Sequence, residues 1–204
     1  MTNKSQADRA AAASKPGAVP VNYREVLDWK ITQSSWRLTV VNLVGLVAIV
    51  VFGILFFGWA ALFGRLAVAA SVGINYLLIL LAALVIMLVT HEMVHGLAMA
   101  AFGARPRFGV LWQALMAYTT APGYAFRRNE YVVVIISPLV ALSLLALMGV
   151  LLVDPPAAVL LATVATLNAA GAVGDLWILS VVLRYPSPAY VVDEKDGMRI
   201  FLPA

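Results

Sequence analysis

The chain has 204 residues, of which 63% are hydrophobic and only 12% are charged. A soluble domain of this length cannot bury that much apolar surface, so the composition excludes an ordinary soluble enzyme and indicates a membrane protein. The net charge is +4. The chain has no cysteines, and their absence excludes disulfide bonds and thiolate metal sites. We therefore expect the lipid bilayer as a partner and expect no nucleic acid.

The N-terminal region divides into two parts. Residues 1–20 are rich in Ala, Ser, Lys and Pro and contain no apolar run. They do not form a signal peptide, because no hydrophobic stretch follows the basic residues, and we expect a disordered tail. Residues 21–37 mix aliphatic and aromatic side chains with basic ones. This mixture predicts a segment that lies on the membrane surface before the first crossing.

Four apolar stretches follow, and each is long enough to cross a bilayer as a helix of about 20 residues. They are expected at about 38–63, 74–102, 130–153 and 157–183. Asp154-Pro155-Pro156 separates the last two and predicts a tight turn between paired helices. The expected fold class is an all-α polytopic membrane protein with a four-transmembrane-helix bundle over residues 38–184.

Two segments outside these helices have strand-like sequences. Residues 108–120 are rich in β-formers and end in the Ala121-Pro122-Gly123 turn, which predicts a short hairpin or re-entrant segment. In the C-terminal tail, 185–204, two apolar triplets flank Asp196-Gly197 and predict a second small hairpin. Short β-like segments are therefore expected in the loop and in the tail.

The distribution of basic residues predicts the direction of the crossings. Six precede the first helix, four lie between the second and third, and three follow the fourth, whereas only Arg65 lies on the other side. Basic residues accumulate on the cytoplasmic side of membrane proteins. Both termini and the 103–129 loop are therefore expected in the cytoplasm.

The end of the second predicted helix carries the sequence His91-Glu92-Met93-Val94-His95. Two histidines four residues apart share one helical face and can bind one metal ion together. Zinc lowers the pKa of water toward ~7, and a carboxylate beside the ligands can take the proton that is released. The pattern predicts His91 and His95 as zinc ligands and Glu92 as the catalytic base of a peptidase.

The motif is specific for a chain of this composition. These are the only two histidines, and random placement would give this spacing with an adjacent glutamate on the order of once in several thousand cases. The alternative is that both histidines only pack between helices, with hydrogen bonds to neighbouring groups. Ionisable groups in the hydrocarbon region cost about 2.5–3.5 kcal/mol each, which favours a functional site.

A zinc site of this type needs a third protein ligand, and Asp175 is the only other acid inside a crossing. At 1.5 Å per residue, Asp175 lies about 14 Å before Arg184, and His95 lies about 15 Å before Arg105. Both helices run toward the cytoplasm, so His95 and Asp175 are expected at the same depth in the membrane to within one helical turn. Glu130, at the mouth of the third helix, is the alternative third ligand.

Three further features lie near this predicted site. Asn168 is two turns before Asp175 on the same face, where it can bind a substrate carbonyl or oxyanion, or form an interhelical hydrogen bond. Pro138 breaks the backbone ladder of the third helix, which opens it toward the site or only kinks it. The small residues at 169–174 predict a close approach of the fourth helix to the metal helix.

These motifs resemble a family of small prokaryotic membrane proteins described as zincin peptidases, which is similar to the core of the site-2 proteases. The resemblance covers roughly residues 75–185, and the matching residues are His91, Glu92, His95, Gly96, Arg128, Tyr131, Pro138, Gly174 and Asp175. It implies zinc-dependent proteolysis in or at a prokaryotic plasma membrane, with Asp175 as third ligand. One departure is that site-2 proteases have Leu-Asp-Gly around this aspartate, whereas this chain has Gly174-Asp175-Leu176.

The sequence also allows two other functions. A metal-ion transporter would also bury histidines and an aspartate, but it needs no glutamate directly after the first histidine. An inactive scaffold would have the same parts, assembled too loosely for catalysis. For the peptidase, membrane proteins that cross the bilayer once are the expected substrates, with membrane-associated peptides as the wider class.

Overall fold

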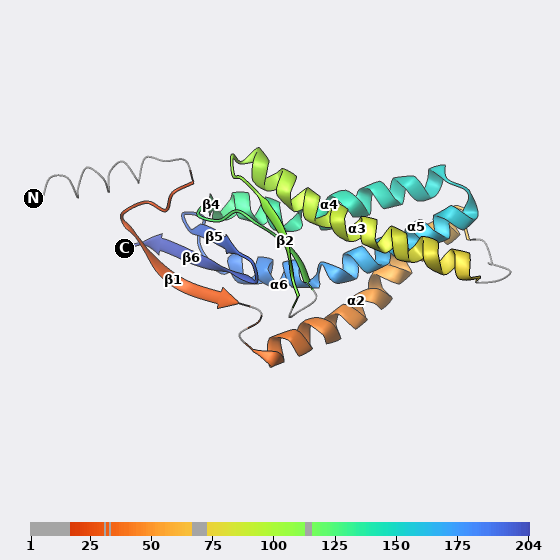
Figure 1. Cartoon of the computed structure of the whole chain (residues 1–204), viewed down its shortest axis with the longest axis horizontal. Coiled ribbons are helices and arrows are strands. Elements are labelled where there is room, and N and C mark those ends of the chain that lie inside the picture. Colours follow the sequence, from red (N-terminus) through yellow and green to blue (C-terminus); the bar gives the residue numbers. More distant parts are fainter. Residues whose placement is uncertain (1–16, 31, 33, 67–72, 113–115) are drawn as a thin grey trace, which may run out of the picture. The chain divides into compact units, whose positions relative to one another are not determined.

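The computed structural model describes residues 17–30, 32, 34–66, 73–112 and 116–204. The predicted disordered tail lies mostly outside the described residues. Long helices dominate (Figure 1): α2 (Ser35–Leu62), α3 (Ile74–Ala101), α4 (Arg128–Leu152), α5 (Pro155–Gly171) and α6 (Val173–Val182). With α5 and α6 counted as one span, these helices give four segments long and apolar enough to cross a membrane. For the described residues, the predicted number and order of helices long and apolar enough to cross a membrane are confirmed.

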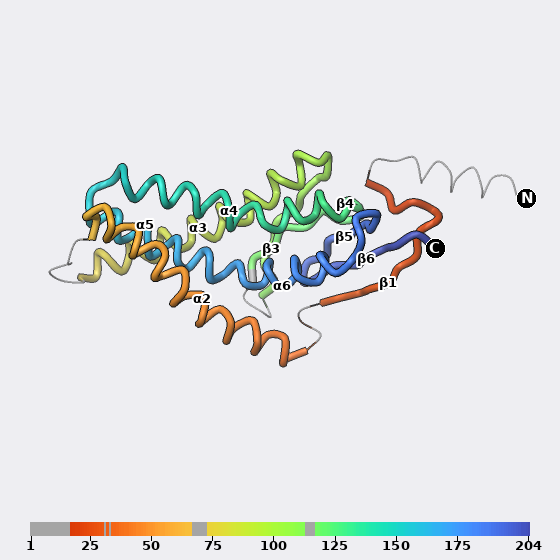
Figure 2. Tube along the Cα trace, turned by 180° about the vertical axis from the view of Figure 1, so that it is seen from behind, coloured from red at the N-terminus to blue at the C-terminus, as the bar shows by residue number. Residues whose placement is uncertain are grey.

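The fourth span is not the continuous helix that was predicted. Ala172 separates α5 from α6 and has φ −70° and ψ 4°, with its N–H donating to the carbonyls of Asn168 and Ala170. The chain continues from one helix into the next (Figure 2). Gly171 and Gly174 flank the break, and glycine costs about 1 kcal/mol relative to alanine in a helix. The break puts Asp175 in the first turn of α6, where a carboxylate is favoured by the helix dipole.

The chain divides into two compact units, and the boundary passes through α3, α4 and α6, so these helices begin in one unit and continue in the other. The helical unit comprises residues 36–94 and 136–177. Its core is a row of alanines on α5, where Ala162, Ala165 and Ala169 pack with Phe56 of α2 and Ala146 of α4. Small side chains let these three helices approach closely, and dispersion attraction between them is effective only at such short distances.

Two of the small residues near the junction of α5 and α6, Gly171 and Gly174, do not make the predicted close contact. Ala170 packs with Ala48 of α2, and a Cβ added at Gly171 or Gly174 would meet nothing within 4 Å. The prediction that these two glycines allow a close helix contact is therefore wrong. In this unit the alanine face of α5 contacts α2 and α4.

The turn between α4 and α5 confirms the predicted helical hairpin. The Arg65 guanidinium donates to the carbonyls of Leu151 at 2.8 Å and Val153 at 3.3 Å. The last carbonyls of a helix have no helical partner, so this arginine satisfies them. Pro155 occupies the start of α5, where the missing N–H carries no cost.

The second unit comprises residues 17–35, 95–135 and 178–204 among those described and contains the strands. One antiparallel sheet has the order β1-β6-β5-β4, formed by β1 (Tyr23–Lys30), β6 (Gly197–Pro203), β5 (Tyr190–Glu194) and β4 (Ala125–Arg127). The predicted tail hairpin is confirmed as β5 and β6, joined across Asp196. The all-α description is incomplete, because β1 and β4 extend this hairpin to four strands.

Strand β1 lies in the segment predicted to rest on the membrane surface. It pairs with the other end of the chain, from Tyr23 opposite Pro203 to Lys30 opposite Gly197. Gly197 is required there, since a Cβ would meet the backbone carbonyl oxygen of Trp29 at 2.0 Å. Contact between residues 21–37 and a membrane stays a prediction.

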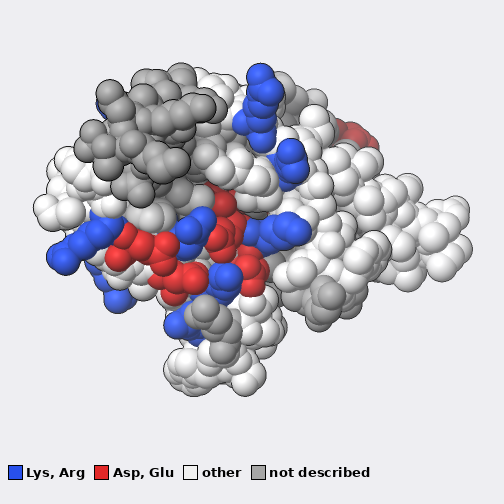
Figure 3. Space-filling model, turned by 60° about the vertical axis from the view of Figure 1, so that its left-hand side comes forward, with Lys and Arg blue, Asp and Glu red and all other residues white. Residues whose placement is uncertain are grey.

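Charged side chains of both signs gather on this sheet (Figure 3). Arg199 donates to Glu194 at 2.6 Å and to Glu25 at 3.3 Å, and Lys30 lies 3.4 Å from Glu194. The negative charges of Asp28 and then Glu194 raise the pKa of the Lys30 ammonium. These pairs join β1, β5 and β6, and each exposed pair is worth little alone.

The predicted loop hairpin is also confirmed. Strands β2 (Arg107–Leu111) and β3 (Met116–Thr120) pair antiparallel as a separate two-stranded sheet. The hairpin contacts α3, because a Cβ on Gly96 would lie 2.5 Å from the Phe108 ring. Gly96 directly follows His95, so this glycine admits the β2 side chain next to the histidine pair.

Candidate metal centre

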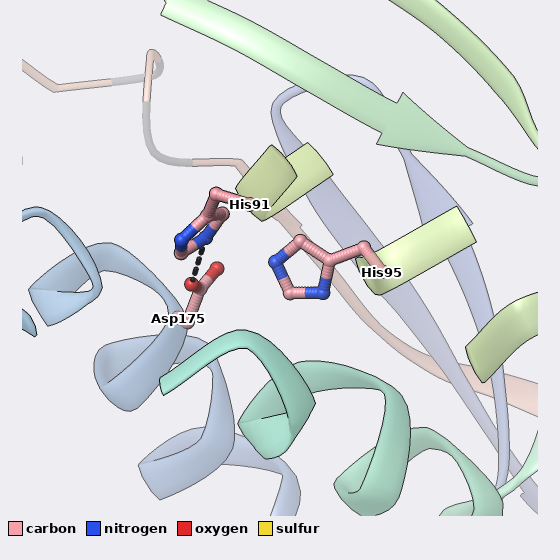
Figure 4. A group of neighbouring side chains, drawn as sticks. All are labelled: His91, His95 and Asp175. Atoms are coloured by element: carbon pink, nitrogen blue, oxygen red, sulfur yellow. Dashed lines mark hydrogen bonds and ion pairs between the residues drawn. The ribbon is translucent and has the colours of Figure 1, made fainter. Parts of the chain in front are cut away.

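Helix α3 carries both histidines of the chain one turn apart. His91 and His95 are each only 9% exposed, although α3 is otherwise the least buried of the four spans. Figure 4 shows both rings on the same side of the helix, with Asp175 of α6 beside them. The predicted shared face of the two histidines is therefore present in the structure.

The two ring nitrogens of His91 have different partners. Nδ1 lies 2.9 Å from Oδ1 of Asn168, and Nε2 lies 3.1 Å from Oδ2 of Asp175. An amide oxygen only accepts, so Nδ1 carries the proton and a neutral ring presents a lone pair at Nε2. That lone pair faces a carboxylate oxygen, an arrangement that a cation or a second proton must stabilise.

His95 is oriented by the backbone of α4. Its Nδ1 lies 2.9 Å from the carbonyl oxygen of Val134 and donates to it. In an unbroken helix that carbonyl would accept from the N–H of residue 138, but Pro138 has none. The proline therefore supplies no N–H to compete with His95 for the Val134 carbonyl, which is a more specific role than the predicted opening or kink.

Both imidazoles are thus held through Nδ1, which leaves Nε2 as the nitrogen for a metal. Outer-shell hydrogen bonds of this kind accompany metal-ligating histidines and fix their tautomer. The ligand atoms of His91, His95 and Asp175 all lie within 4.8 Å of one another. Bonds of about 2.1 Å place neighbouring ligands of tetrahedral zinc about 3.4 Å apart, so small side-chain shifts would close the site.

The donor set fits zinc. Two imidazole nitrogens and one carboxylate oxygen leave the fourth tetrahedral position for water or substrate, as in catalytic rather than structural sites. Asp175 is the acid that the sequence favoured as third ligand, and its side chain is 24% exposed. Among the described residues, it is the carboxylate that joins the histidine pair in a group able to hold a metal.

A family model described as "Putative zincin peptidase" matches residues 84–190. The match covers more than half of the chain and includes both histidines, Glu92 and Asp175. The chain belongs to this family. No curated protein and no solved structure matched the chain. Membership of the zincin peptidase family supports a metallopeptidase with zinc as its metal, in agreement with the donor set.

The structure places the remaining predicted residues as follows. Glu92 follows His91 on α3, about 100° around the helix axis, and is half-buried. Glu130, the alternative ligand, accepts a hydrogen bond from the Arg127 N–H at 2.9 Å in the first turn of α4. A carboxylate there offsets unpaired amides at the helix start, so Glu130 has a local structural role.

Asn168 has a role that the sequence predicted only in general terms. The predicted interhelical hydrogen bond exists, and its partner is His91, one of the two predicted metal ligands. The roles of Val134 and Pro138 in holding His95 were not predicted. Pro138 was the available signal, because a proline inside a helix removes the N–H donor of the carbonyl four residues earlier. The sequence does not reveal which histidine faces that carbonyl.

We expect Pro138→Ala to weaken zinc binding by about 10–100-fold, as loss of outer-shell support does. Alanine restores an N–H that bonds the Val134 carbonyl and competes with His95 for it. Competition with a chromophoric chelator measures the zinc affinity of the purified protein. The matched control is Pro155→Ala, because Pro155 lies at the start of α5 and frees no carbonyl. An unchanged affinity in Pro138→Ala would contradict this role.

Proposed function

We propose that this protein is a membrane-embedded zinc metallopeptidase that hydrolyses peptide bonds of membrane proteins. The observation that carries the proposal is the meeting of His91, His95 and Asp175 from α3 and α6, with a glutamate directly after the first histidine. Two imidazoles and a carboxylate alone would suit several metal proteins. The adjacent glutamate supplies the proton acceptor that hydrolysis needs and that metal storage or transport does not.

The proposed setting is a prokaryotic plasma membrane. Four spans have the length and composition of membrane helices, and the excess of basic residues outside them favours cytoplasmic termini. The metal group then lies inside the spans on the cytoplasmic side. Hydrolysis consumes water, so the site must be reached by water from that side.

In the proposed reaction, His91, His95 and Asp175 would hold a zinc ion, which would supply Lewis-acid activation of water and of the scissile carbonyl. Glu92 accepts a proton from the attacking water and later passes one to the leaving amine. Asn168 and the Val134 carbonyl keep the two imidazoles in the tautomer that presents Nε2. The Asp175 carboxylate would offset part of the positive charge of such an ion.

The hairpin β2–β3 is a candidate for holding the substrate chain. An intact helix hides its carbonyls in its own hydrogen bonds, so a substrate must be extended where it is cut. An extended segment can pair with a strand edge, and Phe108 of β2 lies against Gly96 beside His95. Membrane proteins that cross the bilayer once are the proposed substrates, because a single span can enter laterally.

The test uses the purified full chain in lipid nanodiscs with a single-span model substrate. We expect about one zinc per chain, cleavage of the substrate, and loss of cleavage after chelation that added zinc restores. Metal flux into liposomes without cleavage would replace the proposal with a transporter. Bound zinc without flux and without cleavage of a panel of single-span substrates would replace it with a metal-binding scaffold.

A further inference from the structure

An apolar groove of about 450 Å³ lies among α3, α4 and α5 in the helical unit. Its walls include Ile86 of α3, Leu145 of α4 and Leu161 of α5. Of the described residues that line it, two have polar side chains, Thr90 and Asn168. Its volume is within the range of about 300–1,000 Å³ for ligand sites, so it can hold several side chains of a bound molecule.

The outer walls of this groove are unusually accessible. Only 6% of the most apolar window of α3 is buried, compared with 50% for the α5–α6 span. Ile86 is 66% exposed and Leu145 is 59% exposed. In a bilayer, these side chains face the hydrocarbon region, so a molecule in the membrane can enter the groove from the side.

One polar atom at the end of the groove has no partner. Asn168 is 3% exposed and its Oδ1 is held by His91, but its Nδ2 has no hydrogen-bond partner. The hydroxyl of Thr90, by contrast, donates to the Ile86 carbonyl at 2.7 Å. A buried donor without an acceptor is destabilising, so Nδ2 is placed to meet a carbonyl from an incoming molecule.

The depth of Asn168 indicates which carbonyl can reach it. It lies midway along the span Pro155–Val182, about 20 Å from either end at 1.5 Å per residue. Lipid ester carbonyls lie at the interface, roughly 15 Å from the centre of a hydrocarbon core about 30 Å thick, and acyl chains carry no acceptor. A polypeptide that crosses the membrane has carbonyls at every depth.

We propose that this groove binds the apolar segment of a membrane-crossing polypeptide and that Nδ2 of Asn168 holds one of its backbone carbonyls beside His91. The inference rests on the proposed function and specifies how its substrate is bound. Aliphatic side chains of the substrate occupy the groove along α3. The carbonyl at Asn168 has lost its helical donor, so the substrate is unwound at that point.

Crosslinking tests the groove without requiring catalysis. The chain has no cysteines, so a single cysteine introduced by Ala83→Cys is unique. Ala83 lines the groove, whereas Ala82 is exposed and is not among its lining residues, so Ala82→Cys is the matched control. The probe is a Leu/Ala peptide of about 25 residues with one central cysteine, in nanodiscs with the Glu92→Gln background. With an added thiol oxidant that takes up the two electrons, we expect disulfide formation at least about tenfold faster at position 83 than at position 82.

Equal crosslinking rates at the two positions would overturn the proposal. A phospholipid with a thiol-reactive acyl chain is the second probe. If it labels Ala83→Cys as strongly as the peptide does, the groove is a lipid site and the proposal is overturned. Asn168→Asp keeps an oxygen for the His91 Nδ1–H but removes the donor. We expect it to retain zinc and to lower peptide crosslinking about tenfold, and unchanged crosslinking would contradict the role of Nδ2.

A second measurement separates this inference from the proposed function. Ala83→Trp fills the groove and should lower cleavage of the model substrate about tenfold, whereas Ala82→Trp should not. Unaltered cleavage in Ala83→Trp would refute the groove and leave the peptidase intact. Crosslinking at position 83 in a protein that cleaves nothing would support the groove and refute the peptidase.

Discussion

Glu92→Gln is expected to abolish most of the peptidase activity while leaving zinc binding intact. A general base contributes on the order of 10²–10⁴-fold to a rate, and glutamine has the same shape but cannot take a proton. Glu92 is not one of the three residues that form the metal group, so the ion should stay bound. The measurement is the cleavage rate of a single-span substrate, with zinc content determined on the same preparation.

Glu130→Gln is the matched control for this variant. It removes an equivalent carboxylate that accepts from the Arg127 N–H at the start of α4, and glutamine can still accept that hydrogen bond. Its activity should remain within about twofold of the parent protein, since this position lies outside the metal group. If Glu92→Gln cleaves as fast as Glu130→Gln, Glu92 is not the base. If Glu92→Gln loses its zinc, the glutamate has a ligand role that the proposal does not include.

The metal group could be predicted from the sequence because its determinants are local or nearly unique. His91 and His95 share a helical face by spacing alone, and the long apolar runs place them in a helix. Asp175 is the only acid in another span at a comparable depth, so composition restricted the choice of third ligand. The structure brings it to 3.1 Å from Nε2 of His91.

The parts of the site that were not predicted depend on contacts between helices. Sequence spacing cannot show that His95 Nδ1 reaches the Val134 carbonyl, because that contact depends on the rotation of α3 and α4 about their axes. The break at Ala172 was missed for a related reason. The span from 155 to 182 is apolar throughout, and an apolar run predicts a crossing without showing where its hydrogen bonding is interrupted.

The sheet shows the same limit in the fold. Strands β5 and β6 are joined by a short turn, so local turn residues predicted them. Strand β1 pairs with β6, which lies at the other end of the chain, with Tyr23 opposite Pro203. Its own burial pattern shows no clean alternation, and mainly Trp29 is buried. A strand with one buried side chain has no periodic signal to distinguish it from a surface segment.

Asp175→Asn should lower zinc affinity by more than about 100-fold, since it replaces a charged ligand rather than an outer-shell group. The same change should leave the metal-free protein at least as stable. When the His91 ring is neutral, the asparagine amide can donate to its Nε2 lone pair, which lies 3.1 Å from the carboxylate oxygen in the parent protein. Loss of metal binding with retained or increased stability of the metal-free protein is a result that a merely misfolded variant would not give.

Thermal unfolding with and without zinc measures both effects. A ligand that binds only the folded state stabilises it by RT ln(1 + [L]/Kd), so a 100-fold weaker site loses about 2.7 kcal/mol of zinc-dependent stabilisation at saturating metal. The matched control is Asp154→Asn, in the α4–α5 turn, where the aspartate side chain forms no cap hydrogen bond. Its zinc-dependent increase in Tm should equal that of the parent protein. An equal increase in Asp175→Asn would show that the α6 carboxylate does not bind the metal, because a neutral amide cannot replace the negative charge of that carboxylate.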